Sequence, residues 1–98
     1  MKLSQEQLNI LQSYFSDKPV LKAYVFGSYA RGDADEKSDI DILLQLDYSK
    51  KIGLQYVRMQ LDLEELINRR VDFSTVDFLK PGIQKLVDRE KKLIYEKS

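Results

Sequence analysis

The chain has 98 residues, its 16 basic and 16 acidic side chains cancel, and 43% of its residues are hydrophobic. This length and composition indicate one globular domain that spans residues 1–98 and has a single core. The balanced charge gives no global field that would draw the protein to nucleic acid or to an anionic membrane. No apolar run is long enough to span a bilayer, and the N-terminus lacks a secretory signal, so we expect a cytoplasmic protein.

The sequence contains neither cysteine nor histidine. Disulfides, thiolate metal sites, zinc catalysis, histidine-based triads and cysteine nucleophiles are therefore excluded. The only side-chain metal ligands left are oxygens, which suit magnesium, manganese or calcium.

The first predicted element is a helix. Ser4 and Gln7 have the spacing of a capping box, and apolar residues follow at helical intervals: Leu8, Leu11 and Phe15. Pro19 cannot continue this helix. We therefore expect it to end near residues 17–19.

The next segment predicts a strand that ends in a glycine turn. Residues 20–26 are mostly β-branched or aromatic, and Gly27 follows them directly. We expect Ser28 to cap a short helix over residues 29–31, which Gly32 ends. A glycine and a serine at a helix start can bring backbone amides close to a phosphate, although an isolated Gly-Ser pair is also a common turn.

Residues 39–46 predict a second strand with an unusual polar face. Apolar residues alternate along it, and on the opposite face lie Asp39, Asp41, Leu43 and Gln45. The i, i+2 spacing points both carboxylates to one face, roughly 7 Å apart. Because burying an unpaired charge costs several kcal/mol, the pair needs an open cleft or a cation.

The remaining elements complete one α/β unit. Residues 52–70 predict a helix that covers the sheet with its apolar positions: Leu54, Val57, Leu61, Leu66 and Ile67. Residues 71–76 predict a third strand with Asp72 on the face opposite Val71 and Phe73. Pro81 begins a last helix to about residue 91, and residues 93–95 form a short terminal strand or a tail.

The acids in the strands have two interpretations. Charged residues can protect an edge strand from aggregation, and this would explain a single acid in a strand. It does not explain why two acids lie on the same face, nor why Asp72 recurs in the next predicted strand. Alternatively, Asp39, Asp41 and Asp72 could together hold two divalent cations roughly 3.5–4 Å apart, as an in-line phosphoryl displacement requires. A plain α/β domain without activity is the least favoured alternative.

These motifs also carry a resemblance. Gly27-Ser28, ten residues, then Asp39-x-Asp41, and after a helix a strand containing Asp72, resembles the minimal nucleotidyltransferase domain of the DNA polymerase beta superfamily. Residues 29–32 and Ser38 also fit, and the match covers nearly the whole chain. The resemblance implies a small mixed sheet of three to four strands flanked by helices. It also implies two magnesium ions and transfer of a nucleoside monophosphate, expected to be AMP from ATP, to a hydroxyl.

The resemblance assigns roles to individual residues. Gly27 and Ser28 would hold the triphosphate, Asp39 and Asp41 would bind both metals, and Asp72 would complete the second metal site and help to take the proton of the attacking hydroxyl. Arg31 has two interpretations. It contacts phosphate, or it pairs with an acid of the following loop, Asp33 or Asp35, and fixes the turn.

The resemblance also implies a partner. Larger members of the superfamily carry a further domain that grips the acceptor, and 98 residues leave no room for one. Minimal members are typically encoded beside a helical HEPN toxin, which they neutralise by adding AMP to a tyrosine or by binding. Two alternatives remain: an antitoxin that masks its partner without catalysis, and a nucleotidyltransferase that modifies a small molecule such as an antibiotic.

Overall fold

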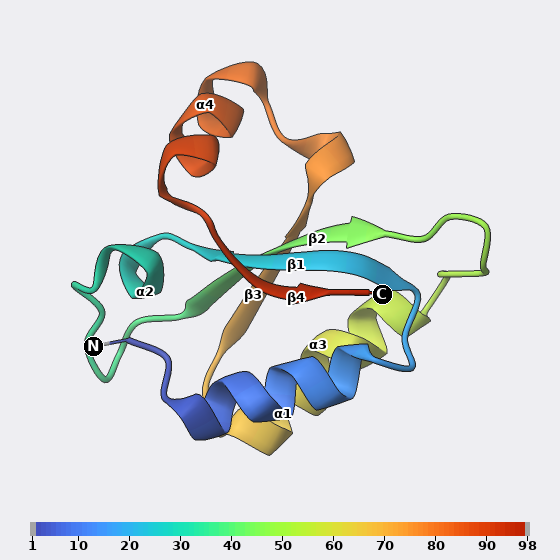
Figure 1. The fold of residues 1–98 in the computed structure, drawn as a ribbon, viewed down its shortest axis with the longest axis horizontal. Coiled ribbons are helices and arrows are strands. Elements are labelled where there is room, and N and C mark those ends of the chain that lie inside the picture. Colours follow the sequence, from blue (N-terminus) through green and yellow to red (C-terminus); the bar gives the residue numbers. More distant parts are fainter. Residues whose placement is uncertain (1, 98) are drawn as a thin grey trace.

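The structure is a computed structural model that describes residues 2–97. Helices and strands alternate along the chain and form one mixed sheet (Figure 1). In chain order the elements are α1 (Gln5–Phe15), β1 (Val20–Phe26), α2 (Ser28–Arg31), β2 (Ile40–Leu46), α3 (Gln55–Ile67), β3 (Val71–Thr75), the 3₁₀ turn η1 (Val76–Phe78), α4 (Pro81–Glu90) and β4 (Lys92–Glu96).

The sheet has the strand order β3-β2-β1-β4. β1 runs antiparallel to both β2 and β4, whereas β2 and β3 are parallel and are joined through α3. The predicted mixed sheet flanked by helices is confirmed. The C-terminal segment, which the sequence left as strand or tail, is the edge strand β4.

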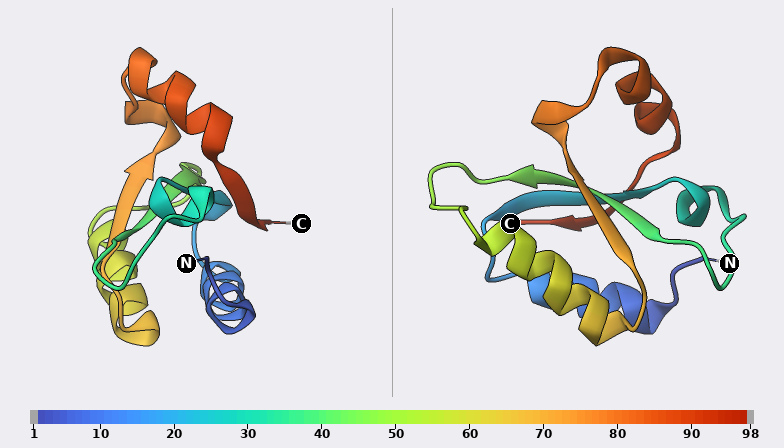
Figure 2. Two further views of the ribbon diagram at one scale, coloured as in Figure 1. Left: turned by 90° about the vertical axis from the view of Figure 1, so that its left-hand side faces the viewer. Right: turned by 180° about the vertical axis from the view of Figure 1, so that it is seen from behind.

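The helices lie on both faces of the sheet. α1 and α3 cover one face, and α4 stands over the other (Figures 1 and 2). The main core lies under α1 and α3, where the predicted apolar face of β2 is almost completely buried at Ile40, Ile42 and Leu44. Leu43 faces the other way but is only 1% exposed, so part of the face beneath α4 is also closed to water.

The predicted capping box of α1 is confirmed. The Ser4 hydroxyl accepts the Gln7 amide at 3.0 Å, and the Gln7 side chain accepts the Ser4 amide at 2.9 Å. A hydrogen bond of 2.7 Å from the Tyr14 hydroxyl to the Asp62 carboxylate then joins α1 to α3. The two helices are therefore fixed to each other as well as to the sheet.

The prediction for the packing face of α3 was wrong at four positions and correct at Ile67, which packs partly against the core. Its predicted core positions Leu54, Val57, Leu61 and Leu66 are all more than half exposed. The residues that α3 buries are Met59 and Leu63, with Tyr56 and Ile67 packed partly against the core. The helix carries apolar residues on two sides, and spacing alone selected the wrong one.

Several boundaries also differ from the predictions. β2 begins at Ile40, so Asp39 lies just before the strand, and α3 begins at Gln55 rather than at residue 52. Gly27, not Ser28, occupies the N-cap of α2, because Ser28 already has helical geometry. No helix within residues 2–97 is long and apolar enough to cross a membrane.

Candidate active site

Three adjacent strands bring Gly27, Asp41 and Asp72 to the same end of the sheet. Asp41 on β2 pairs with Phe26, the last residue of β1, and on its other side with Asp72 of β3. Directly paired residues point to the same face of a sheet. Asp41 and Asp72 therefore share the face under α4, with Gly27 directly after Phe26. The order across the sheet is the Gly27 turn, Asp41, then Asp72.

The backbone at Gly27 explains why a glycine stands there. Its φ of 71° and ψ of −149° fall in a region that is essentially restricted to glycine. A Cβ at this position would also collide with the carboxylate of Asp41, whose Cγ would be 3.2 Å away. The glycine turn is thus in van der Waals contact with the acidic cluster. The α2 helix that follows has only one turn, so its dipole is small. Its first backbone N–H groups, and not the dipole, are therefore the groups that could bind an anion.

The electrostatics of the cluster centre on Asp41. Burial and then the negative charges of Asp72 and Asp39 raise the pKa of Asp41 from 3.8 to about 6. Asp39 and Asp72 are themselves exposed. Asp39 and Asp72 are therefore close enough to Asp41 to repel its charge, and this repulsion makes the position of Asp41 receptive to a cation.

The chemistry of this cluster suits a divalent metal. Carboxylate oxygens are the ligands that magnesium and manganese prefer. A bound cation would also relieve the repulsion that Asp39 and Asp72 exert on Asp41. Within residues 2–97 no three acidic side chains form a ready-made metal site. The donor chemistry of Asp39, Asp41 and Asp72 fits a divalent cation, although their oxygens do not converge on one point in this structure.

Arg31 pairs with two acids. Its guanidinium binds Asp33 at 3.2 Å, as one of the sequence interpretations proposed, and does not pair with Asp35. It also donates to both carboxylate oxygens of Glu90, at 3.2 and 3.1 Å. These two carboxylates raise the pKa of Arg31 above its ordinary value.

Glu90 is the site residue that sequence reasoning missed. It is the last residue of α4, and its side chain is only 14% exposed. One of its oxygens accepts the backbone N–H of Gly27 at 3.2 Å as well as the Arg31 guanidinium. A carboxylate thus occupies the place next to the glycine turn where the sequence predicted phosphate.

These features define a class of protein: a small mixed α/β domain that presents a glycine turn beside acids from neighbouring strands. Comparison with known families matches residues 9–98 to the polymerase beta nucleotidyltransferases, and the chain belongs to this family. The family expected from the sequence is therefore confirmed.

Related proteins carry more specific names. The chain is 44% identical over 66 residues to protein adenylyltransferase MntA of Thermococcus cleftensis. This alignment covers 67% of the present chain and 66% of the relative, which is slightly less than two thirds of the relative's length. It is 34% identical over 101 residues to a Methanocaldococcus jannaschii protein that is provisionally named a protein adenylyltransferase. That alignment covers 97% of this chain and 99% of the relative.

Solved structures share the fold. A toxin–antitoxin complex with AMP-PNP matches with a TM-score of 0.73 and 19% identity over 97% of this chain and 76% of that one. A complex of an AMPylated Shewanella oneidensis HEPN toxin with its MNT antitoxin matches with a TM-score of 0.70 and 17% identity, over 96% and 73% of the two chains. At these identities the likeness concerns the fold alone.

Proposed function

We propose that this protein is a magnesium-dependent nucleotidyltransferase that transfers AMP from ATP to a tyrosine hydroxyl of a helical HEPN-type partner, and so acts as an antitoxin in the cytoplasm. The observation that supports it most is the alignment of the Gly27 turn, Asp41 and Asp72 across three neighbouring strands. This order gives the triphosphate and the acceptor separate sides of one acidic centre.

In the proposed reaction the acceptor oxygen attacks the α-phosphorus of ATP. A new oxygen–phosphorus bond forms, the bond between the α-phosphorus and the bridging oxygen breaks, and pyrophosphate leaves with the electron pair. Asp72 is exposed at the acceptor side and takes the proton of the hydroxyl. Gly27, Ser28 and Arg31 bind the outer phosphates with backbone amides and a guanidinium.

Asp39, Asp41 and Asp72 would hold the two divalent cations. When bound, these ions neutralise the charge that builds on the triphosphate and lower the pKa of the attacking hydroxyl. The protein would contribute the fixed positions of the reactants. Positioning and electrostatic stabilisation are the main sources of rate in phosphoryl transfer, because little covalent chemistry is left for side chains.

The relatives support the partner and the acceptor. The name protein adenylyltransferase, carried by the Thermococcus relative, describes transfer of AMP to a protein. The Shewanella complex contains an AMPylated HEPN toxin with an MNT antitoxin of the same fold.

The decisive experiment uses purified protein, a purified candidate HEPN partner, magnesium and labelled ATP. Wild-type protein should transfer label to the partner, and intact-mass analysis should show an added AMP. The double variant Asp39→Ala with Asp41→Ala should transfer none, whereas Glu65→Gln, an exposed acid on α3, serves as the matched control. Equal labelling by the double variant would refute the proposed active site.

The same variants distinguish the catalytic antitoxin from the alternative, an antitoxin that masks its partner without catalysis. If the double variant binds the partner and neutralises it as well as the wild type does, the protein acts by masking its partner. If neutralisation disappears together with label transfer, catalysis is the function.

A further inference from the structure

The α3 helix carries an apolar stripe on the side that faces away from the sheet. Three side chains form it at intervals of three and four residues, and their exposed fractions are 87%, 54% and 59%: Leu54, Val57 and Leu61. This spacing puts them in one row along the helix. The outer side of a surface helix normally carries charged or polar side chains, so a row of exposed aliphatic residues indicates an interaction surface.

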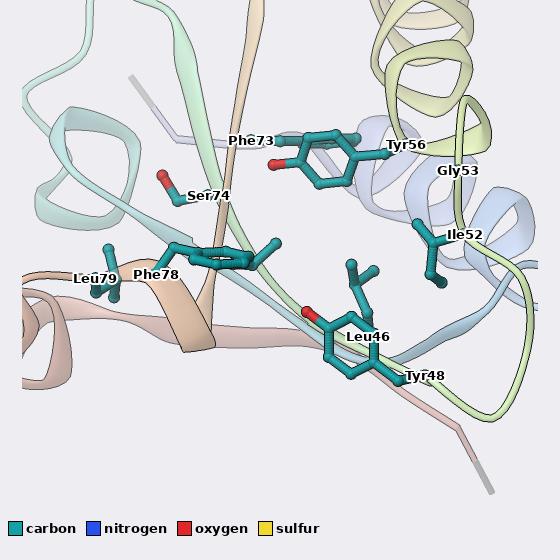
Figure 3. A pocket seen from close by; sticks show the side chains of 10 residues that line it. Leu46, Tyr48, Ile52, Gly53, Tyr56, Phe73, Ser74, Phe78 and Leu79 are labelled. Carbon is teal, nitrogen blue, oxygen red and sulfur yellow. The ribbon is translucent and has the colours of Figure 1, made fainter.

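Exposed apolar surface continues beyond the start of α3. Gly53, next to Leu54, lines a cavity of about 540 Å³ at the edge of the sheet, and four aromatic side chains also line it (Figure 3): Tyr48, Tyr56, Phe73 and Phe78. The cavity lies on the α3 side of β3, because Phe73 alternates with Asp72 along the strand. Stripe and cavity therefore share one side of the molecule, away from the acidic centre.

Two charged residues flank the stripe. Arg58 and Glu65 are both exposed, and neither forms an ion pair in the part of the chain that the structure describes. They are seven residues, or two helical turns, apart, so they lie on the same flank of α3 but about 10 Å from each other along it. Each charge is therefore available to a second molecule.

A second copy of α3 that runs in the opposite direction complements both features. If the two helices cross at a point between residues 61 and 62, Arg58 of each copy lies level with Glu65 of the other, and the two Leu61 side chains meet at the centre. Two helices that run in the same direction would instead bring this flank against the flank that holds Gln60, which has no charge. The charge pattern thus fits an antiparallel pair.

The neighbouring helix does not oppose this arrangement. α1 lies beside α3, joined to it by the hydrogen bond from Tyr14 to Asp62, and its only charged residue is Glu6. Its exposed side chains are otherwise polar and uncharged: Gln5, Asn9, Gln12 and Ser13. An antiparallel pair of α3 helices places the two α1 helices on the same side of the contact. Few like charges would meet there.

We propose that the protein forms an antiparallel dimer through α3. The apolar stripe of one copy packs against the same stripe of the other, and Arg58 pairs with Glu65 in both directions. Contact between identical patches around a two-fold axis is the commonest arrangement in soluble oligomers. Asp41 and Asp72 lie on the opposite face of each sheet, so both acidic centres stay open to substrates. The inference does not rest on the proposed transfer reaction.

The dimer should be weak and reversible. The apolar stripe is short, because the next position of the row is Glu64, whose carboxylate accepts the amide of Val71. A contact made by so few turns of helix is smaller than the roughly 800 Å² per partner of a standard interface, so we expect a Kd of roughly 10–100 µM.

Sedimentation equilibrium at about 5–500 µM brackets this Kd. The wild type should change from monomer to dimer over that range. Leu61→Glu should remain a monomer, because two carboxylates would meet at the centre of the contact. Leu66→Glu is the matched control, since Leu66 is 55% exposed on the same helix but lies outside the stripe. A wild type that stays monomeric throughout overturns the inference, and so does equal loss of the dimer in both variants.

Charge reversal tests the direction of the pairing. Arg58→Glu and Glu65→Arg should each raise the Kd of the dimer roughly tenfold, because each creates two like-charge contacts. The two substitutions together restore opposite charges and should restore the Kd of the wild type. If the double variant associates no better than the single variants, the antiparallel pairing is refuted. Circular dichroism of the dilute, monomeric variants checks that each one is folded.

The same variants would reveal a different occupant of this surface. If the wild type is monomeric at every concentration and Leu61→Glu, but not Leu66→Glu, loses binding to a purified helical HEPN-type partner, the stripe docks that partner and the dimer is refuted. A dimer that forms in a protein without transfer activity would refute the proposed function and leave this inference standing. Because the acidic centres lie on the far face, Glu65→Gln remains a control for transfer.

Discussion

The backbone N–H of Gly27 donates to a carboxylate oxygen of Glu90 at 3.2 Å, although 63 residues separate them. The same carboxylate also binds Arg31, so it engages two of the groups that the proposed reaction uses for phosphate. A triphosphate would have to displace Glu90 from both. α4, which ends at Glu90, would then move or its last side chain would turn away.

Replacing Glu90 by glutamine should therefore strengthen triphosphate binding. The substitution keeps the size of the side chain and removes a negative charge that competes for Gly27 and Arg31. We expect the Kd for tripolyphosphate, measured by calorimetry, to fall roughly tenfold, which corresponds to about 1.4 kcal/mol of binding free energy. Glu65→Gln, a distant exposed acid, should have no effect. Weaker binding by Glu90→Gln would show instead that Glu90 holds Arg31 in its phosphate-binding position.

Gly27→Ala should damage both stability and the site. The new Cβ would be forced into a glycine-only conformation and against the Asp41 carboxylate. We expect a loss of roughly 3 kcal/mol in the free energy of unfolding, measured by urea denaturation. Gly82→Ala is the matched control, because Gly82 lies in α4 at negative φ and a Cβ there meets nothing within 4 Å. It should be neutral or slightly stabilising.

Asp41→Asn should stabilise the metal-free protein in a pH-dependent way. The pKa of Asp41 is raised to about 6 in the fold, against 3.8 ordinarily, so the folded state binds its proton more tightly than the unfolded chain does. The free energy of unfolding of the wild type then falls as pH rises from about 4 to about 6, because Asp41 ionises more easily in the unfolded chain. Above that range the loss of stability is complete, and at pH 4 it is still small.

Thermal melts with EDTA at pH 4 and pH 8 measure this effect. The variant should melt above the wild type at pH 8 and close to it at pH 4, while the exposed Glu36→Gln should change neither. Added magnesium should stabilise the wild type more than the variant, since the ion removes the repulsion. A gain of equal size at both pH values would show that the charge of Asp41 is not responsible.

The parts of the fold and site that follow from local patterns were predictable. Alternation along residues 40–46 placed Asp41 on the face opposite Ile40, Ile42 and Leu44, and the same rule placed Asp72 opposite Val71 and Phe73. The pairing of Asp41 with Asp72 required only that the two strands be neighbours. Strand periodicity is strict, because successive side chains point to opposite faces.

The features that the sequence did not predict depend on distant parts of the chain. Glu90 lies 59 residues from Arg31, and no spacing rule connects a helix C-terminus to a glycine turn at that separation. α3 has apolar residues on two sides, and only the position of α1 and the sheet determines that Met59 and Leu63 are buried. The cavity beside β3 likewise forms from segments that meet only in the fold.

Tyr14→Phe should weaken the layer of helices that supports the sheet without disturbing the site. The Tyr14 hydroxyl donates to Asp62 at 2.7 Å in a partly buried place, and burial followed by this carboxylate raises the pKa of Tyr14 above its ordinary value. A hydrogen bond to a charged group contributes about 1.5–3 kcal/mol. We expect the variant to lose an amount near the lower limit, because water can reach Asp62.

A double-mutant cycle with Asp62→Asn isolates this bond, since Tyr14→Phe should have a smaller effect when Asp62 is already replaced. α1 and α3 lie on one face of the sheet (Figure 2), and the strand alternation puts Asp41 and Asp72 on the opposite face. Transfer activity at low temperature should therefore equal that of the wild type. If activity falls in proportion to stability while the variant remains folded, the packing of α1 against α3 also controls the alignment of the acidic strands.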